Sequence, residues 1–145
     1  MAEVNDAKRL EVEERNARNI PLIEEFRANG GLPDNPEVLL LHHRGAKTGN
    51  PRVNPVVFTA AGDDFAVFAS NAGRPANPDW FYNLVAHPRT SIEIGPETIE
   101  VLARVAPREE RSAIWEPWKI KMPGFAEYEK TAAPREIPVV ILERV

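Results

Sequence analysis

Residues 38–58, with the sequence VLLLHHRGAKTGNPRVNPVVF, form the stretch that decides the fold. It starts with an apolar run, VLLL, and ends with another, VVF, and a polar segment with two glycines lies between them. Continuous apolar runs are typical of strands that are covered on both faces. We therefore predict strands over residues 37–43 and 52–60, joined by a loop. Pro55 lies inside the second strand and marks an edge, a bulge or a strand end that faces a ligand, because proline cannot donate to a ladder.

The loop between these two strands is basic, although the chain as a whole is acidic. Residues 38–62 contain no Asp or Glu, whereas the full chain has 22 acidic residues against 18 Lys and Arg. Cations and the bare N–H groups of a glycine-bearing turn can converge on an anion. Lys47 would act as a point charge, Arg52 as a planar fork and Thr48 through its hydroxyl, while Gly49 would let the backbone approach closely. The alternative is a solvated loop whose charges serve solubility.

The rest of the chain alternates short strands with helices. Residues 1–29 are predicted to be helical, with an interruption at Pro21 and an end at the glycine pair of residues 30–31. We expect residues 1–20 to form a helical arm and residues 21–145 to form the domain. Because neighbouring strands are predicted to pair as antiparallel hairpins, the expected fold class is α+β, a small barrel of about six mainly antiparallel strands with flanking helices. Beyond the first pair, the predicted strands cover residues 65–70, 90–94, 98–106 and 137–142, and the predicted helices cover residues 79–86, 107–122 and 125–131.

Composition limits the classes of function. The 145 residues are 43% hydrophobic and 28% charged, as in ordinary soluble domains, and the net charge of -4 argues against nucleic acid as a partner. The chain has no cysteine, which excludes disulfides and thiolate chemistry and fits a reducing compartment. We expect no signal peptide and no transmembrane segment. The expected location is the cytoplasm, with peripheral contact with a membrane surface left open, and the expected state is a monomer or a homodimer.

Several familiar catalytic patterns are absent. The segment around Lys47 lacks the spaced glycine of a nucleotide-binding phosphate loop and is not followed by a predicted helix, and no dinucleotide-binding fingerprint occurs. Ser70 has no nearby His–acid pair in the sequence that would suggest a hydrolase triad. His42 and His43 are adjacent on a strand, so they point to opposite faces and cannot bind one metal together. We predict no metal site, assign no catalytic residue and expect neither histidine to take part in the chemistry.

Polar and aromatic residues follow the third predicted strand. Ser70 and Asn71 begin a loop rich in glycine and proline, and the next helix carries Trp80 and Asn83 on one face. The simplest role for a tryptophan at helical spacing is core packing. The alternative is that aromatic faces form the wall of a pocket for a flat ligand. The same two interpretations apply to the later aromatic residues Trp115, Trp118, Phe125 and Tyr128.

Four motifs, in this order, resemble the deazaflavin-dependent nitroreductase family. They are GxKTGxPRxxP from Gly45, ASNxG from Ala69, NPxWFxNL from Asn77 and RxIPVVxL from Arg135. The resemblance runs from about Phe26 to the C-terminus. It implies a split β-barrel related to barrels that bind flavin mononucleotide. It also implies that the 8-hydroxy-5-deazaflavin coenzyme F-420, in its reduced form, donates a hydride to an electrophilic acceptor.

The resemblance also assigns roles to residues. The basic loop would hold the phosphate and acidic tail of the coenzyme through Lys47, Thr48, Gly49 and Arg52. The deazaflavin ring and the ribityl region would lie against Ser70 and Asn71, with Pro55 nearby. The short helix would secure the coenzyme through Trp80 and Asn83.

The acceptor pocket implied by the resemblance departs from that of nitro-reducing members. Those members often carry tyrosines in the segment that matches residues 122–125 and near Val57, where this chain has Met122, Phe125 and Val57, although Tyr128 remains. Asn71 also stands where some relatives carry a lysine. We therefore expect an apolar pocket formed by Val57, Met122, Phe125 and Tyr128, and a quinone-like or other conjugated apolar acceptor.

Two alternatives remain open from the sequence. The same cationic loop could hold the phosphate of flavin mononucleotide, which would make the protein a flavin reductase on the same barrel. The lack of a conventional acid–base set also allows a non-enzymatic carrier of an anionic apolar ligand.

Overall fold

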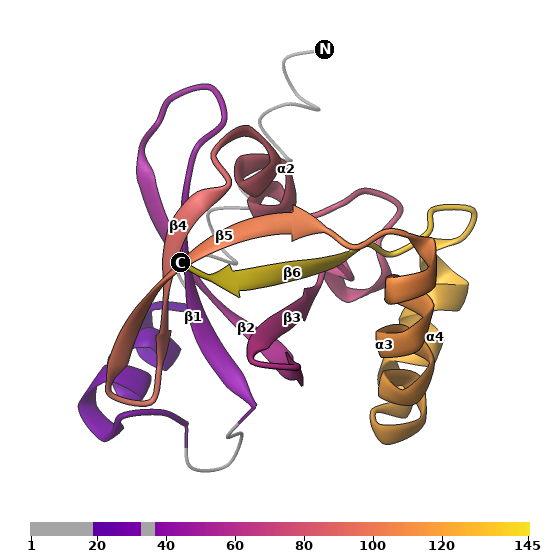
Figure 1. Cartoon of the computed structure of the whole chain (residues 1–145), viewed down its shortest axis with the longest axis horizontal. Helices are drawn as coiled ribbons and strands as arrows, with labels where there is room; N and C mark the ends of the chain where they lie inside the picture. The colour runs from indigo at the N-terminus through magenta and orange to yellow at the C-terminus, as the bar shows by residue number, and fades with distance from the viewer. Residues whose placement is uncertain (1–18, 33–36) are drawn as a thin grey trace.

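The computed structural model describes residues 19–32 and 37–145, and its six strands form a closed antiparallel barrel (Figure 1). The order around the barrel is β1-β2-β3-β6-β5-β4. The predicted α+β barrel of six antiparallel strands is confirmed, and every predicted strand is present with small shifts of its ends. The strands are β1 (Val38–Arg44), β2 (Pro51–Ala61), β3 (Asp64–Phe68), β4 (Arg89–Ile94), β5 (Glu97–Val105) and β6 (Val139–Arg144).

Helices cover the ends and one side of the barrel (Figure 1). The helix α2 (Asp79–Ala86) lies over one end, and α3 (Arg108–Lys121) and α4 (Pro123–Ala132) pack together beside the barrel. A 3-10 turn, η1 (Asn71–Gly73), follows β3, and residues 19–29 are helical. The predicted break between the last two helices occurs at Met122. α4 starts earlier than predicted, because Pro123 is accepted in a first helical turn, where its missing N–H costs no hydrogen bond.

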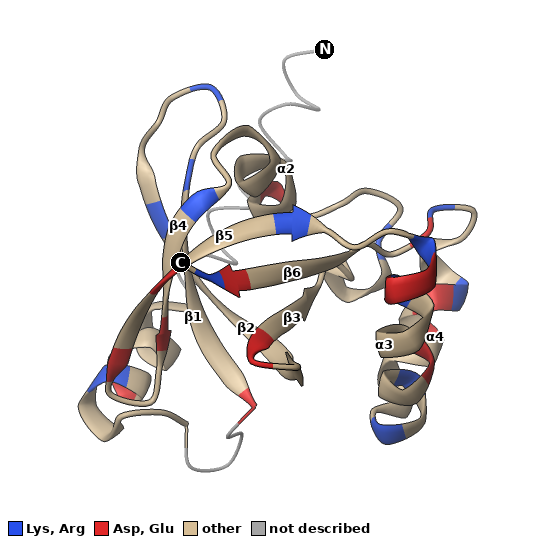
Figure 2. Ribbon diagram, in the orientation of Figure 1, with Lys and Arg blue, Asp and Glu red and all other residues tan. Residues whose placement is uncertain are grey.

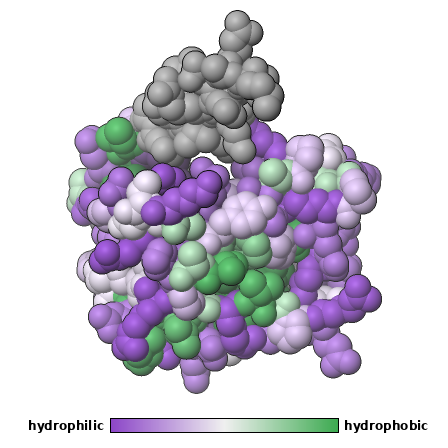
Figure 3. Space-filling view, turned by 90° about the horizontal axis from the view of Figure 1, so that it is seen from above, coloured by the Kyte–Doolittle hydropathy of each residue, from purple (hydrophilic) through white to green (hydrophobic). Residues whose placement is uncertain are grey.

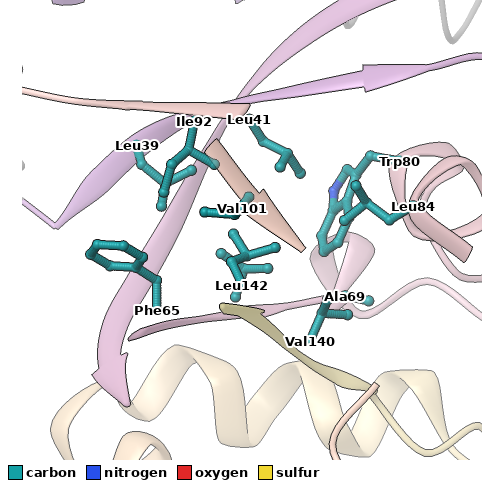
Figure 4. Packing of buried hydrophobic residues seen from close by; sticks show 11 residues of the cluster. Leu39, Leu41, Phe65, Ala69, Trp80, Leu84, Ile92, Val101, Val140 and Leu142 are labelled. Atoms are coloured by element: carbon teal, nitrogen blue, oxygen red, sulfur yellow. The ribbon is translucent and has the colours of Figure 1, made fainter. Parts of the chain in front are cut away.

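Apolar side chains form two clusters on opposite sides of the sheet. One fills the barrel, where side chains from the strands meet Trp80 and Leu84 of α2 (Figure 4). The other lies between the outer surface of the barrel and the pair α3 and α4. Residues of β3 alternate between the clusters, as the period of a strand requires: Phe65 and Val67 point inward, whereas Ala66 and Phe68 point outward. Both faces of β3 are therefore buried, which explains its continuous apolar sequence.

The first half of β2 is paired on one side only. β1 pairs with β2 from Val38 to Arg44, but β3 pairs with β2 only from Phe58 onward. Pro55, opposite Leu40 of β1, therefore lies in a half-strand whose other side has no partner strand. A proline is tolerated there because no ladder hydrogen bond is lost on the open side. This open side of the barrel is where a ligand can approach.

The helix over residues 19–29 is attached to the barrel by packing and charge. Phe26 is buried, and Arg27 donates two hydrogen bonds to Glu93 of β4, at 3.2 and 2.9 Å. His42 Nε2 lies 2.7 Å from the same carboxylate, and these bonds hold the pKa of Glu93 below its usual value. The helix already includes residue 20, while residues 1–18 of the predicted arm lie outside the described residues. The division of the chain near residue 20 stays a prediction.

Apolar side chains also reach the surface near α2. Val85 of α2 and Leu102 and Val105 of β5 are exposed, and Figure 3 shows an apolar patch among the hydrophilic residues on this end of the molecule. In the described part of the chain these three residues are 43–60% exposed. Across the same described residues, no helix has both the length and the apolar content needed to cross a membrane.

Candidate functional site

A cavity of about 470 Å³ opens beside the unpaired half of β2. Its wall comes from β1 and β2, from the loop after β3, from the start of α2 and from α4. One part of the wall is polar and partly cationic, and another part is apolar and aromatic. This combination suits a ligand that has both an anionic and a flat apolar portion. The residues that line the cavity include His43, Arg52, Asn54, Pro55, Val57, Ser70, Asn71, Arg74, Trp80, Phe125 and Tyr128.

The β1–β2 turn is a compact structure made by its glycines. The Gly45 N–H donates to the Asn50 carbonyl at 2.9 Å, and the Gly49 N–H donates to the Gly45 carbonyl at 2.8 Å. Gly49 has a φ of 71°, which favours glycine. A Cβ on Gly45 would lie 2.5 Å from Thr48 Oγ1, so a side chain there would force the Thr48 hydroxyl to move. Thr48 and Lys47 are thereby held on the surface at the tip of a preformed turn.

Arg52 connects this turn to the cavity. It is the member of the basic loop that lines the cavity, whereas Lys47, Thr48 and Gly49 are not among the lining residues. Its guanidinium lies 4.0 Å from Asp79 at the start of α2, and its side chain is 40% exposed. Such a long, solvated ion pair contributes little, so the guanidinium remains able to bind an anion. Figure 2 shows that Lys and Arg gather at this end of the barrel, on the β1–β2 turn and the adjacent strand ends.

Two buried polar residues support the site from inside. His43 and Asn83 are 3% and 5% exposed. Asn83 Oδ1 accepts the Ala46 N–H at 2.8 Å, Asn83 Nδ2 lies 3.0 Å from His43 Nδ1, and His43 Nε2 lies 2.6 Å from Asn54 Oδ1. Asn83 therefore does not line the cavity but ties α2 to the β1–β2 turn. Burial, opposed by the hydrogen bond to Asn54, lowers the pKa of His43 below its ordinary 6.5.

This lowered pKa predicts a pH-dependent contribution to stability. Below pH 6.5 the unfolded chain binds a proton at His43 that the folded chain does not, so stability falls as pH falls through that range and is kept above it. The slope from one such group is at most about 1.4 kcal/mol per pH unit. We expect the free energy of unfolding of the wild type to approach that of His43→Gln as pH drops from about 7 to about 5. The measurement is chemical denaturation at several pH values. If the difference in free energy of unfolding between the two proteins were the same at every pH, the prediction would be contradicted.

The loop after β3 is held by Arg135. Its guanidinium donates to the carbonyls of Ala69 at 3.0 Å, Ser70 at 2.9 Å and Arg74 at 2.8 Å, and to Asn77 Oδ1 at 2.6 Å. These bonds fix a segment in which Asn71 and Ala72 have positive φ values, and they place Ser70 and Asn71 in the wall of the cavity.

Gly73 brings α4 against the same loop. The Thr131 hydroxyl of α4 donates to the Gly73 carbonyl at 2.8 Å. A Cβ on Gly73 would lie 2.1 Å from Thr131 Oγ1 and 2.9 Å from Tyr128 Cα, so only glycine allows this approach. The contact places Tyr128 beside Ser70 and Asn71 as part of the wall.

The apolar wall of the cavity includes Val57, Phe68, Trp80, Phe125 and Tyr128. The rings of Phe125 and Tyr128 are 5.3 Å apart in an edge arrangement, and Phe125 also packs in the outer core cluster. Trp80 belongs to the core inside the barrel and also lines the cavity, while its contact with a flat ligand stays a prediction. Met122 packs against the outer core cluster and is not among the lining residues.

Three residues at the site were given no role there by sequence reasoning: Arg135, His43 and Asn54. Arg135 was quoted only within a motif, because its partners are carbonyl groups that leave no trace in a sequence. His43 was expected to take no part in the chemistry, yet it lines the cavity and bonds to Asn54. The period of the strand could have located it, since His43 pairs in register with Arg52, and directly opposed residues share a face.

Comparison with known proteins decides the family. A family model described as F420H(2)-dependent quinone reductase matches residues 14–144. The chain belongs to this family. The deazaflavin-dependent resemblance seen in the sequence is thereby confirmed. Relatives in this family and solved structures agree with the assignment.

The similar proteins span most of the chain. The F420H(2)-dependent quinone reductase Rv1261c of Mycobacterium tuberculosis is 34% identical over 115 residues, which is 78% of this chain and 77% of the relative. A solved F420-H2 dependent reductase, FDR-A, is 32% identical with a TM-score of 0.66 and covers 74% of this chain and 94% of its own. A chain described as a domain-swapped dimer is 30% identical, with a TM-score of 0.69 over 91% of this chain and 96% of its own.

Proposed function

We propose that this protein transfers a hydride from reduced coenzyme F-420 to a quinone-like or other conjugated apolar acceptor. Its family makes it an F420-dependent reductase, and the acceptor class and the residue roles are what the proposal adds. The observation that carries the proposal is one cavity with a cationic, amide-bearing side at Arg52 and Asn54 and an aromatic side at Phe125 and Tyr128. The coenzyme is a long anion with a flat ring system, so its phosphate would use the cationic side and its ring the aromatic side.

The residues of the cavity fit the coenzyme. Arg52 would hold its phosphate as a fork, with Lys47, Thr48 and Gly49 on the adjoining turn engaging the acidic tail. Those three residues are not part of the wall, and Lys47 and Thr48 are exposed, which suits a tail that extends toward solvent. Asn83 would act indirectly, since its amide holds the Ala46 N–H and thus the turn.

The flat part of the coenzyme would lie deeper in the cavity. Ser70, Asn71 and Pro55 would line the ring and the ribityl region, and Trp80 would close the inner end, where it already packs in the barrel core. The loop that carries Ser70 is rigid by its bonds to Arg135, so little ordering is required on binding.

The acceptor would bind against the apolar wall. Val57, Phe125 and Tyr128 offer mainly apolar surface, with Met122 packed behind them. When bound, reduced F-420 supplies the hydride, and the protein needs no nucleophile of its own. The chain's part is to hold donor and acceptor face to face and to exclude water from the apolar side.

Replacing Arg52 with alanine tests the coenzyme site. Because charge-assisted hydrogen bonds contribute about 1.5–3 kcal/mol, we expect Arg52→Ala to weaken binding of F-420 by about tenfold or more. Hydride transfer from the bound coenzyme should change less, since the guanidinium is proposed to hold the phosphate. The measurements are a fluorescence titration with F-420 and single-turnover oxidation of the reduced coenzyme by menadione. Arg108→Ala, an exposed arginine outside the cavity, is the matched control.

A parallel titration with flavin mononucleotide decides between the two coenzymes. The proposal expects saturable binding of F-420 and much weaker binding of the flavin. Tighter binding of the flavin, or no saturable binding of F-420 by the wild type, would refute it. Binding of F-420 without turnover of any conjugated acceptor would instead favour the carrier function.

The proposal also places the protein in the cytoplasm, where a chain without cysteines loses nothing in a reducing environment. Whether it contacts a membrane surface, and whether it acts as a monomer or a homodimer, stay predictions. One similar solved chain is described as a domain-swapped dimer.

A further inference from the structure

The hydrogen-bond chain behind the cavity can run in only one direction. The Ala46 backbone N–H can only donate, so the group facing it must be the carbonyl oxygen of the Asn83 amide, at 2.8 Å. The Asn83 NH2 then faces His43 and donates to Nδ1 at 3.0 Å. Nδ1 must therefore carry no proton, and in a neutral imidazole the proton lies on Nε2. His43 Nε2–H donates to Asn54 Oδ1 at 2.6 Å.

This direction determines what Asn54 offers to the cavity. Because its oxygen is engaged by His43, the remaining group is the NH2, which has two N–H donors and no acceptor. Asn54 lines the cavity and is half-buried, and within residues 19–32 and 37–145 its Nδ2 makes no hydrogen bond. The Ala46 N–H in the β1–β2 turn thus determines, through the side chains of Asn83 and His43, that Asn54 presents hydrogen-bond donors to the cavity.

The register of the strands places this donor beside the cation of the site. Arg52 and Asn54 are two residues apart on β2, so their side chains project from the same face. His43 and Leu41 are their partners on β1, and Leu41 packs inside the barrel. Arg52 and Asn54 therefore form a row of donors on the inward face, without a carboxylate on this part of β2.

We propose that Asn54 binds an acceptor oxygen of the coenzyme, and that His43 is a positioning residue that keeps the Asn54 amide turned so that only its N–H groups face the ligand. The inference rests on the proposed function and adds two residues to it. A carbonyl or phosphate oxygen would be bound, and a ligand group that is itself a donor would be rejected. Asn83 completes the chain by holding Nδ1 of His43 as an acceptor.

Substitutions at His43 separate this positioning role from a general structural role. In His43→Gln the amide nitrogen lies near the place of Nε2 and can still donate to Asn54. In His43→Asn the shorter amide can accept from Asn83 but cannot reach Asn54. We expect His43→Gln to bind F-420 within about threefold of the wild type, and His43→Asn and Asn54→Ala each to bind about tenfold more weakly, as the loss of one hydrogen bond implies. Asn29→Ala, in the helix over residues 19–29, is the matched control.

A second measurement needs no coenzyme. Nitrogen-15 NMR of the imidazole of His43 reports which ring nitrogen carries the proton, and we expect the neutral Nε2–H form at pH 7. A proton on Nδ1 would overturn the inference, as would Asn54→Ala binding F-420 like the wild type, or His43→Gln and His43→Asn weakening binding equally. All three of these results leave the proposed function intact. A wild type that does not bind F-420 would overturn both, so the two failures are distinguishable.

Discussion

Replacing Arg135 with methionine is expected to lower the free energy of unfolding by about 3–5 kcal/mol, because several partly buried acceptors would each lose a hydrogen bond to a charged donor. The guanidinium bonds three backbone carbonyls and the side chain of Asn77. Methionine fills a similar volume but donates to none of them, so acceptors would be left unsatisfied. Burial lowers the pKa of Arg135, although an arginine stays charged, and its partners are carbonyl dipoles rather than a carboxylate in the described part of the chain.

The same substitution is expected to weaken F-420 binding by about tenfold, because ordering a loop that has lost its support costs free energy on binding. The loop carries Ser70 and Asn71, and Arg135 donates hydrogen bonds to the carbonyls of Ala69 and Ser70. Arg135→Lys is the matched control. It keeps the charge but lacks the fork that serves several carbonyls at once, so we expect it to restore about half of the lost stability. Denaturant unfolding and fluorescence titration measure the two effects. A free energy of unfolding within about 1 kcal/mol of the wild type would contradict the prediction.

The barrel could be predicted from the sequence because its signals are local. Apolar runs, the glycine–proline turn at residues 95–96 and the alternation on either side of it each specify an element without reference to the rest of the chain. The basic turn with Gly49 was also recognisable, since a positive φ and a cluster of cations leave a compositional signature. What these signals could not supply is which side chains meet across elements.

The site shows where that limit lies. Lys47 and Thr48 are predicted to bind the coenzyme together with Arg52, and of these three residues Arg52 is the one that lines the cavity. Asn83 was expected to face the cavity from its helix, yet its amide bonds a backbone N–H of the β1–β2 turn, a partner that no side-chain pattern could indicate. Register and backbone partners depend on the closed barrel, so Asn83 could be placed only after the strands had been paired.

Replacing Trp115 with alanine is expected to lower the free energy of unfolding by about 3–5 kcal/mol, the usual cost of deleting a fully buried large aromatic side chain. Trp115 is 0% exposed and packs between α3, α4 and β3, with its ring centroid 5.7 Å from that of Phe68 and 6.3 Å from that of Phe125. Its Nε1–H donates to Glu129 of α4 at 2.5 Å, and this bond contributes most to lowering the pKa of Glu129.

We expect the loss of packing in Trp115→Ala to disturb the side of the cavity proposed for the acceptor, and to leave the side proposed for the phosphate of the coenzyme unchanged. Phe125 packs on Trp115 and also lines the cavity, whereas Arg52 belongs to β2 and lies near Asp79 of α2. We therefore expect Trp115→Ala, assayed well below its unfolding temperature, to raise the KM for menadione severalfold while the Kd for F-420 changes less than twofold. Trp115→Phe keeps much of the packing but loses the N–H, so it should recover most of the stability and nearly all of the KM. If coenzyme binding fell as far as acceptor binding, the two sides of the cavity would not be separate, and the assignment of the acceptor to the α4 wall would fail.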